Sequence, residues 1–195
     1  MKNICVFCGS SWGNRKEYEA AATAISRQIA RRGYGLVYGG SSAGLMGACA
    51  DAALAEGGKV IGILPHSLKE KEIDHRGLTE LHLVDSMHER KSLMEQLSDG
   101  FISLPGGIGT MDELFEMWTW GMLGWHDKPS ALFNVDGYYD DLVRFLDRTA
   151  SDAFLRQAHR DMLIVETDMD RLFERMEAYE APKVGKWIPK DGDAI

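Results

Sequence analysis

The segment from Leu104 to Glu116 reads LPGGIGTMDELFE and combines residue types that suit an anion-binding site. Gly106, Gly107 and Gly109 follow the apolar run from Phe101 to Leu104, and a polar helical turn comes after them. A glycine turn that leads into a helix presents backbone N–H groups, which bind anions such as phosphate. The segment therefore predicts a phosphate-binding turn between a strand and a helix.

Thr110 and Glu113 stand in the S/T-x-x-E spacing within this segment. In that spacing the hydroxyl caps the new helix, and the carboxylate reaches back to the first residue. A carboxylate beside a phosphate site is equally suited to activate water or to stabilise a developing positive charge. Both interpretations of Glu113, helix cap and reactive group, stay open on the spacing alone.

A second polar cluster runs from Asp85 to Lys91 and ends in the basic pair Arg90-Lys91. Arginine offers a planar donor group for phosphate or a ring nitrogen, and lysine adds a point charge. The alternative is a solvated helical face on which the two cations pair with Glu89 and Glu95, an interaction that is common and weak.

Two familiar nucleotide fingerprints fail in this chain. Residues Gly39 to Gly44 have the glycine spacing of a P-loop, but Leu45 and Met46 replace the Lys and Ser/Thr that hold phosphate and magnesium. Gly107-Ile108-Gly109 begins a dinucleotide motif, but Asp112 stands where its third glycine belongs. These departures argue against a triphosphate hydrolase and a nicotinamide cofactor, and they favour a short ligand such as a nucleoside monophosphate.

The elements that position these clusters are short apolar runs alternating with helical patterns. Continuously apolar runs are typical of a sheet covered on both faces, so we expect an α/β fold with a doubly wound, mostly parallel sheet of about seven strands and helices on both faces. We expect one domain over residues 1–179 and a C-terminal tail over 180–195. The predicted strands are Ile4 to Phe7, Gly35 to Tyr38, Val60 to Leu64, Leu81 to Val84, Phe101 to Leu104, Ala131 to Val135 and Leu163 to Val165. The predicted helices are Glu17 to Arg32, Leu45 to Glu56, Met87 to Leu97, Met111 to Leu123, Tyr139 to Arg148 and Met169 to Tyr179.

Composition limits the partners. A net charge of -8 and a pI near 5.2 give no basic surface for nucleic acid or an anionic membrane, and no apolar stretch approaches the roughly 20 residues of a membrane span. We expect a cytoplasmic protein. Cys5, Cys8 and Cys49 are expected to be buried thiols, and the histidines have no metal-ligand spacing, so we expect no metal.

One helical segment is apolar on nearly every side. Phe115 to Trp125 reads FEMWTWGMLGW. A helix of this kind must be buried on more than one face, and aromatic residues and methionine are enriched at protein interfaces. We therefore expect a homodimer contact here, with simple burial in the core as the alternative.

The two polar clusters together resemble the signature of a known family. Ser86 to Lys91 read SMHERK and Pro105 to Glu113 read PGGIGTMDE. In this order they are similar to the paired signature of the LOG (lonely guy) family, the cytokinin riboside 5'-monophosphate phosphoribohydrolases, once widely labelled lysine decarboxylases. The resemblance extends from about Ile4 to about Tyr179. Shorter matching words fall at Phe7 to Ser11, Val37 to Gly40, Gly44 to Gly47, Thr119-Trp120 and Asn134 to Tyr139.

The resemblance implies a Rossmann-like fold, a homodimer and hydrolysis of the N-glycosidic bond of adenosine-type 5'-monophosphates. The substrates would be AMP or N6-modified cytokinin riboside 5'-monophosphates, the products free base and ribose 5-phosphate, and no cofactor would be needed. The family's catalytic positions fall on Arg90 and Glu113. Its ligand contacts fall on Glu72, Arg90, Lys91, Gly107, Ile108, Gly109, Thr110, Met111, Asp112, Glu113 and Thr119. We add Ser10, Gly40, Ser41 and Met87 as further substrate-binding candidates from the neighbouring turns and the signature helix.

The chemistry suggests a role for each catalytic candidate. Cleavage of the C1'–N9 bond passes through a cationic sugar, which Glu113 would stabilise while it activates water. Arg90 would orient the nucleotide and stabilise charge on the departing base. Asp112 is a poor second carboxylate, because adjacent helical residues point about 100° apart.

Other classes of protein remain as alternatives. A non-catalytic nucleotide or molybdenum-cofactor carrier would share the fold and would not need the Arg90 and Glu113 pair. A lysine decarboxylase would need a Schiff-base lysine and a pyridoxal phosphate site. A structural or interaction protein would use the glycine turns for packing only.

Overall fold

The structure, a computed structural model, describes residues 1–69 and 74–182. One sheet contains seven strands in the order β4-β3-β2-β1-β5-β6-β7, and all adjacent strands pair in parallel. The predicted fold class is therefore confirmed, with a wholly parallel sheet. The strands are β1 (Asn3–Phe7), β2 (Gly35–Tyr38), β3 (Val60–Pro65), β4 (Glu80–Val84), β5 (Phe101–Ser103), β6 (Ser130–Phe133) and β7 (Leu163–Glu166).

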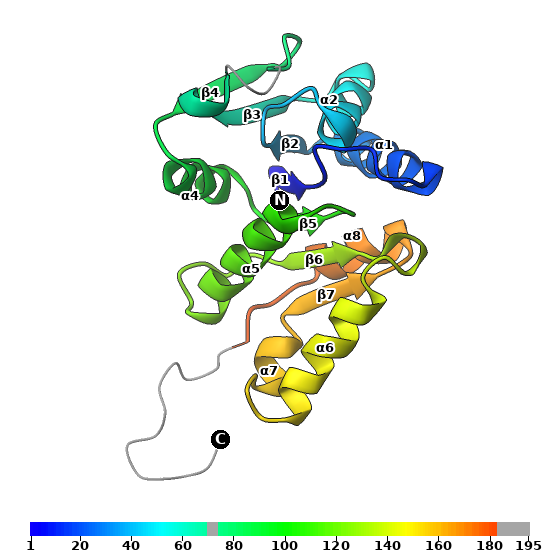
Figure 1. The fold of residues 1–195 in the computed structure, drawn as a ribbon, viewed down its shortest axis with the longest axis vertical. Helices are drawn as coiled ribbons and strands as arrows, with labels where there is room; N and C mark the ends of the chain where they lie inside the picture. Colours follow the sequence, from blue (N-terminus) through cyan, green and yellow to red (C-terminus); the bar gives the residue numbers. More distant parts are fainter. Residues whose placement is uncertain (70–73, 183–195) are drawn as a thin grey trace.

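Helices cover both faces of this sheet (Figure 1). The long helices are α1 (Lys16–Arg31), α2 (Gly44–Ala55), α4 (Met87–Leu97), α5 (Ile108–Met122), α6 (Asp140–Ser151) and α8 (Met169–Glu177). The sequence predicts each of them. It does not predict α3 (His66–Lys69), α7 (Gln157–Arg160) and the 3-10 turn η1 (Val135–Gly137), because segments this short show no helical periodicity. The predicted strand Ala131 to Val135 ends earlier, at Phe133.

Alternate residues of β1 show how the sheet divides the core. Ile4 and Val6 pack with residues of α1, α2 and α8, whereas Cys5 and Phe7 pack with Met94 of α4 and other residues on the opposite face. This period of two is the geometry of an extended strand. Cys5 and Cys8 fall on opposite sides for the same reason, and all three cysteines are buried and free, as predicted.

The strand order reverses between β1 and β5, and this reversal fixes where a ligand can bind. From β1 the chain builds outward through β2, β3 and β4, and it then returns to place β5 on the other side of β1. The turns after β1 and β5 consequently lie side by side, and the Gly9 N–H donates to the Pro105 carbonyl at 3.1 Å. Ligands of doubly wound sheets bind at such a switch point.

The turn after β1 is also held against the start of α2. A Cβ atom on Gly44, which has a φ of +53°, would lie 2.5 Å from the Ser10 carbonyl carbon and from the Ser11 nitrogen. Glycine adopts this backbone conformation without strain, and only a residue without a side chain permits this close approach. Three turns, after β1, β2 and β5, therefore meet at one edge of the sheet.

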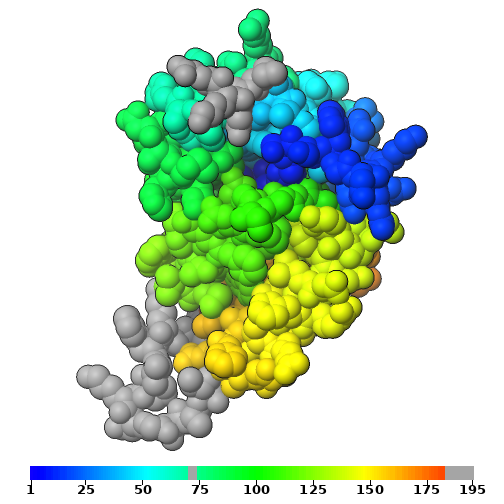
Figure 2. Space-filling model, in the orientation of Figure 1, coloured from blue at the N-terminus to red at the C-terminus, as the bar shows by residue number. Residues whose placement is uncertain are grey.

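In the space-filling view of Figure 2, the blue and cyan N-terminal residues share the upper part of the molecule with teal and green residues, further green residues cross the middle, and the yellow residues occupy the lower part. Within the described ranges, no helix has both the length and the apolarity needed to cross a membrane. The predicted tail lies outside the described residues from position 183 onward.

Candidate active site

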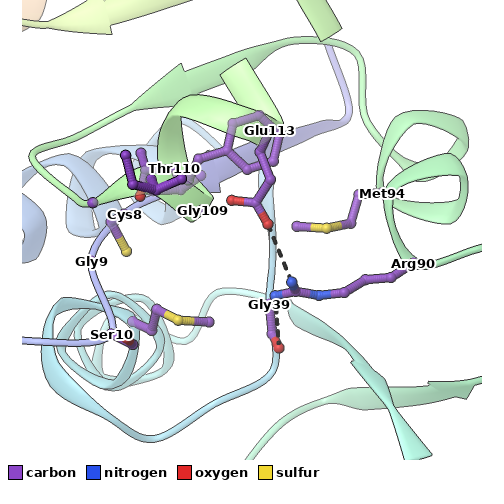
Figure 3. A pocket seen from close by; sticks show the side chains of 14 residues that line it. Cys8, Gly9, Ser10, Gly39, Arg90, Met94, Gly109, Thr110 and Glu113 are labelled. Carbon is purple, nitrogen blue, oxygen red and sulfur yellow. Dashed lines mark hydrogen bonds and ion pairs between the residues drawn. The ribbon is translucent and has the colours of Figure 1, made fainter. Parts of the chain in front are cut away.

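A pocket of about 280 Å³ opens at the switch point between β1 and β5 (Figure 3). Its walls come from the turns after β1 and β2, from α4 and from the start of α5. The predicted residues Ser10, Arg90, Gly107, Ile108, Gly109, Thr110 and Glu113 line it, together with Val6, Phe7, Cys8, Gly9, Gly39, Met46 and Met94. The two polar clusters singled out in the sequence therefore meet in one cavity.

Arg90 is buried, with 7% of its surface exposed. Its Nε donates to the Ile63 carbonyl at 3.1 Å, its Nη2 donates to the Gly39 carbonyl at 3.4 Å, and its Nη1 lies 3.3 Å from Glu113 Oε1. Two backbone carbonyls at strand ends thus fix the guanidinium and leave one edge for the carboxylate. The interpretation of this cluster as a solvated helical face is wrong.

The position of Arg90 depends on the absence of a side chain at Gly39. A Cβ atom there would lie 2.0 Å from Arg90 Nη2 and 2.4 Å from Met46 Cε. Figure 3 shows the guanidinium lying against Gly39, with the Glu113 carboxylate facing it directly and Met94 beside the pair. Glycine at position 39 therefore leaves the space that the Arg90 guanidinium occupies, in addition to forming the turn after β2.

Glu113 is also buried, and its carboxyl group has a raised pKa. Burial raises the pKa of its carboxyl group from 4.5 to about 7, because the charged form loses hydration, and Arg90 opposes this rise without cancelling it. Near neutral pH the carboxyl group is therefore partly protonated and partly ionised. A carboxyl group with such a pKa can exchange a proton with water at physiological pH.

The capping interpretation of Thr110 and Glu113 is wrong. Helix α5 begins at Ile108 rather than at Met111, its N-cap is Gly107, and no side chain caps it. Thr110 is therefore already inside the first turn, and Glu113 lies too far along the helix to reach back to the cap. The carboxylate of Glu113 faces Arg90 instead.

The other cluster contains a side-chain cap, in which the glutamate reaches back to the residue before the N-cap Ser86. The Glu89 N–H donates to Ser86 Oγ at 3.1 Å, and Glu89 Oε2 accepts from the Asp85 N–H at 2.8 Å. These contacts fix the start of α4 immediately before Arg90. They set the direction from which the arginine enters the pocket.

Lys91 forms a second buried ion-pair group beside the first. Its Nζ lies 3.0 Å from Asp112 Oδ2 and 2.9 Å from Glu116 Oε2. Burial alone would lower the pKa of Lys91, but the hydrogen bonds that its ammonium group donates to Glu116 and Asp112 outweigh burial, and the net effect is a raised pKa. Lys91 is therefore a fixed cation that joins α4 to α5, and Asp112 points away from Glu113 as expected.

The start of α5 offers amide groups to an anion. The first N–H groups of a helix have no partner within the helix. A Cβ atom on Gly107 or Gly109 would meet no atom within 4 Å, so packing does not require glycine at either position. The missing side chains leave open space in front of the helix start, where phosphate is favoured by the N–H groups and the helix dipole.

Two tyrosine hydroxyl groups hold the turn before α5 in place. A Cβ atom on Gly106 would lie 2.1 Å from Thr110 Oγ1, and Tyr138 Oη donates to the Gly106 carbonyl at 2.6 Å. Tyr139 Oη donates to the Leu104 carbonyl, also at 2.6 Å. These contacts fix the turn before any ligand binds.

Some predicted site residues lie elsewhere. Met87 is exposed at the start of α4, and Thr119 is exposed on α5; neither lines this pocket. Gly40 and Ser41 follow the pocket residue Gly39 but are not among its lining residues. Lys91, Met111 and Asp112 flank the pocket without lining it, and Glu72 lies outside the described residues.

Seven lining residues are not among the predicted site residues: Val6, Phe7, Cys8, Gly9, Gly39, Met46 and Met94. Met94 follows Arg90 by four positions in α4, and this spacing puts the two side chains on one helical face. The sequence therefore contains a signal that could identify Met94 as a pocket residue. Met46 and Cys8 carry no comparable signal, because both are ordinary core residues by type.

Comparisons with known proteins agree on one family. The protein family described as "Possible lysine decarboxylase" matches residues 46–176. A cytokinin riboside 5'-monophosphate phosphoribohydrolase of Arabidopsis thaliana is 45% identical over 180 residues, which cover 92% of this chain and 79% of that protein. A second Arabidopsis thaliana protein of the same name is 42% identical and covers 97% of this chain and 89% of its own length. A protein of Oryza sativa subsp. japonica described as a probable enzyme of this name is 43% identical, covering 97% and 76%.

Solved structures share the fold at lower identity. The molybdenum cofactor binding protein of Rippkaea orientalis has a TM-score of 0.69 and 20% identity, covering 91% of this chain and 97% of that one. The molybdenum cofactor carrier protein of Chlamydomonas reinhardtii has a TM-score of 0.68 and 20% identity, covering 91% and 96%. At this identity the likeness shows the fold alone.

The burial of Glu113 predicts a carboxyl titration near pH 7. Carboxyl-carbon NMR of glutamate-labelled protein should show one resonance with this midpoint, and Glu113→Gln should remove it. Arg90→Gln should move the midpoint upward, because it removes a positive charge that favours the ionised form. A Glu113 midpoint near 4.5 would contradict the burial argument.

Proposed function

Because the chain belongs to the LOG family of cytokinin riboside 5'-monophosphate phosphoribohydrolases, we propose that it hydrolyses the N-glycosidic bond of adenosine-type nucleoside 5'-monophosphates. The products are the free base and ribose 5-phosphate. The observation that carries the proposal is the buried pair of Arg90 and Glu113, which faces open helix N–H groups across one pocket. The pair supplies a cation and an ionisable carboxyl group within reach of a phosphate-binding turn.

The phosphate binds at the start of α5 in this proposal. Gly107 and Gly109 leave room for it, and the N–H groups through Thr110 donate to its oxygens. Ser10 adds a hydroxyl from the opposite wall. Lys91, which Asp112 and Glu116 of α5 hold in place, contributes positive charge near this site. With the phosphate fixed, the ribose extends along the pocket toward Glu113.

The reaction then uses the two buried side chains. The ionised Glu113 carboxylate stabilises positive charge on the sugar and accepts a proton from water as the water oxygen bonds to C1'. The C1'–N9 bond breaks, and the base leaves with its bonding electrons and gains the proton that water lost. Arg90 stabilises the negative charge that develops on the base. The rate should rise with pH through about 7, because only the ionised form of Glu113 accepts the proton.

The alternative functions lack comparable support. A decarboxylase would need a neutral lysine amine for a Schiff base, whereas Lys91 is held as a cation by Asp112 and Glu116. A molybdenum-cofactor carrier would not need the Arg90 and Glu113 pair. Relatives at 42–45% identity carry the hydrolase name, whereas the carriers share only the fold.

Base release from defined nucleotides tests the proposed function. The protein is incubated with AMP, ADP, adenosine and N6-isopentenyladenosine 5'-monophosphate, and chromatography measures the free base and ribose 5-phosphate. We expect equal amounts of both products from one or both monophosphates, and little release from adenosine, which lacks the phosphate that the helix start binds. Absence of base release from all four compounds would refute the hydrolase assignment.

We also propose that the protein is a homodimer. Helix α5 buries Leu114, Met117 and Trp118 in the core of the domain. Leu123 and Trp125, which follow the end of the helix at Met122, are exposed, the latter by 68%. Exposed aromatic residues beside an apolar helix end favour contact with a second copy.

Sedimentation velocity tests the proposed dimer. The full chain should sediment with the mass of two copies, and Trp125→Glu should reduce this mass to one copy, because a charge would then have to be buried at the contact. Phe154→Glu is a matched control, since Phe154 is 88% exposed outside α5 and should leave the mass unchanged. A single-copy mass for the unmodified chain would contradict the dimer.

A further inference from the structure

A hydrogen-bonded cluster around His75 lies outside the pocket and has no part in the chemistry described above. His75 belongs to the segment 74–77, which leads from the region after α3 toward β4. Its Nε2 lies 2.9 Å from Asp51 Oδ1 in α2, and the side chain is only 11% exposed. The Gly77 N–H donates to His75 Nδ1 at 3.1 Å. Both ring nitrogens are therefore engaged.

These two contacts define the form of the histidine. Nδ1 accepts from a backbone N–H, so it carries no hydrogen, and the ring hydrogen must lie on Nε2. Nε2 then donates to the Asp51 carboxylate. The ring is thus held in one orientation between α2 and its own segment.

The backbone of the same segment holds the turn after β2. The His75 N–H donates to the Gly40 carbonyl at 3.2 Å, and Asp74 forms an antiparallel bridge with Ser41. Gly39, the first residue of this turn, accepts from Arg90 through its carbonyl and leaves room for the guanidinium. A continuous set of contacts therefore runs from Asp51 through His75 and the glycine turn to Arg90.

We propose that His75 is a positioning residue for Arg90: by joining α2 to the segment 74–77, it fixes the Gly39-Gly40 turn on which the guanidinium rests. This inference rests on the proposed hydrolase function. Asp51 is 75% exposed, so its pair with His75 contributes little to overall stability. Catalysis is more sensitive, because a displacement of about 1 Å in a catalytic group can cost about 100-fold in rate. Loss of the His75 side chain should therefore affect turnover more than folding.

Turnover of His75 variants tests the proposal. His75→Ala should lower kcat about 10- to 100-fold with a thermal midpoint close to that of the unmodified protein. His75→Gln should recover most of the loss, because the glutamine Nε2 can donate to Asp51 in place of the ring. Asp51→Ala changes an exposed residue and should reproduce the loss, which keeps the test valid if His75→Ala fails to fold.

Two comparisons separate positioning from general destabilisation. His82 pairs with Glu80 at 3.3 Å on the exposed surface of β4, so His82→Ala is a matched control that should leave kcat unchanged. In an Arg90→Lys background, His75→Ala should cause no further loss, because its effect passes through Arg90.

Three results bear on the proposal in different ways. Unchanged kcat in both His75→Ala and Asp51→Ala would overturn it. A lower thermal midpoint with normal kcat per folded molecule would do the same, since it would indicate a structural role only. Absence of base release by the unmodified protein would instead refute the proposed hydrolase function, so the two failures are distinguishable.

Discussion

The buried ion pair between Arg90 and Glu113 is the constraint on which the rest of the site depends. Two charged groups lose hydration in the pocket, and their mutual attraction offsets this cost only if further hydrogen bonds hold them. The chain supplies those bonds from the carbonyls of Ile63, within β3, and of Gly39, directly after β2. Among the described residues Glu113 has the ion pair with Arg90 and no comparable set of backbone hydrogen bonds, and burial raises its pKa to about 7. The asymmetry leaves a permanent cation facing a carboxyl group that can change its charge near neutral pH.

The fold brings this pair together through its strand order. Because β1 lies between β2 and β5, the helices that follow β4 and β5 cover the same face, and Arg90 in α4 meets Glu113 in α5. The same reversal places the start of α5 beside the turn after β1. The anion-binding N–H groups and the ion pair are therefore products of one topological feature. The second ion-pair group, around Lys91, joins the same two helices and holds their spacing.

The sequence predicts the fold well, because every long element has a strong local pattern. Continuously apolar runs identify all seven strands, and helical periodicity identifies the six long helices.

The residues of the site are harder to predict from the sequence than the fold. Arg90 and Glu113 were assigned through the family resemblance, since spacing alone left helix capping and surface pairing as alternatives. Both alternatives fail for reasons that arise in three dimensions. Helix α5 begins three residues earlier than predicted, which moves Thr110 inside the helix, and Arg90 is buried by strand ends that are distant in the sequence. Gly39 illustrates the same limit, because its need for glycine comes from a side chain 51 positions away.

The central claim is that the carboxylate of Glu113 performs the chemistry while the glycine turn binds the substrate. Glu113→Gln tests this most directly, because the amide keeps the size of the side chain and removes its ability to accept a proton. Nucleotide affinity from calorimetry and turnover from base release are measured on the same preparation. The account predicts unchanged AMP affinity and a loss of at least ~100-fold in turnover, the low end of acid–base contributions. Turnover close to that of the unmodified protein would contradict it.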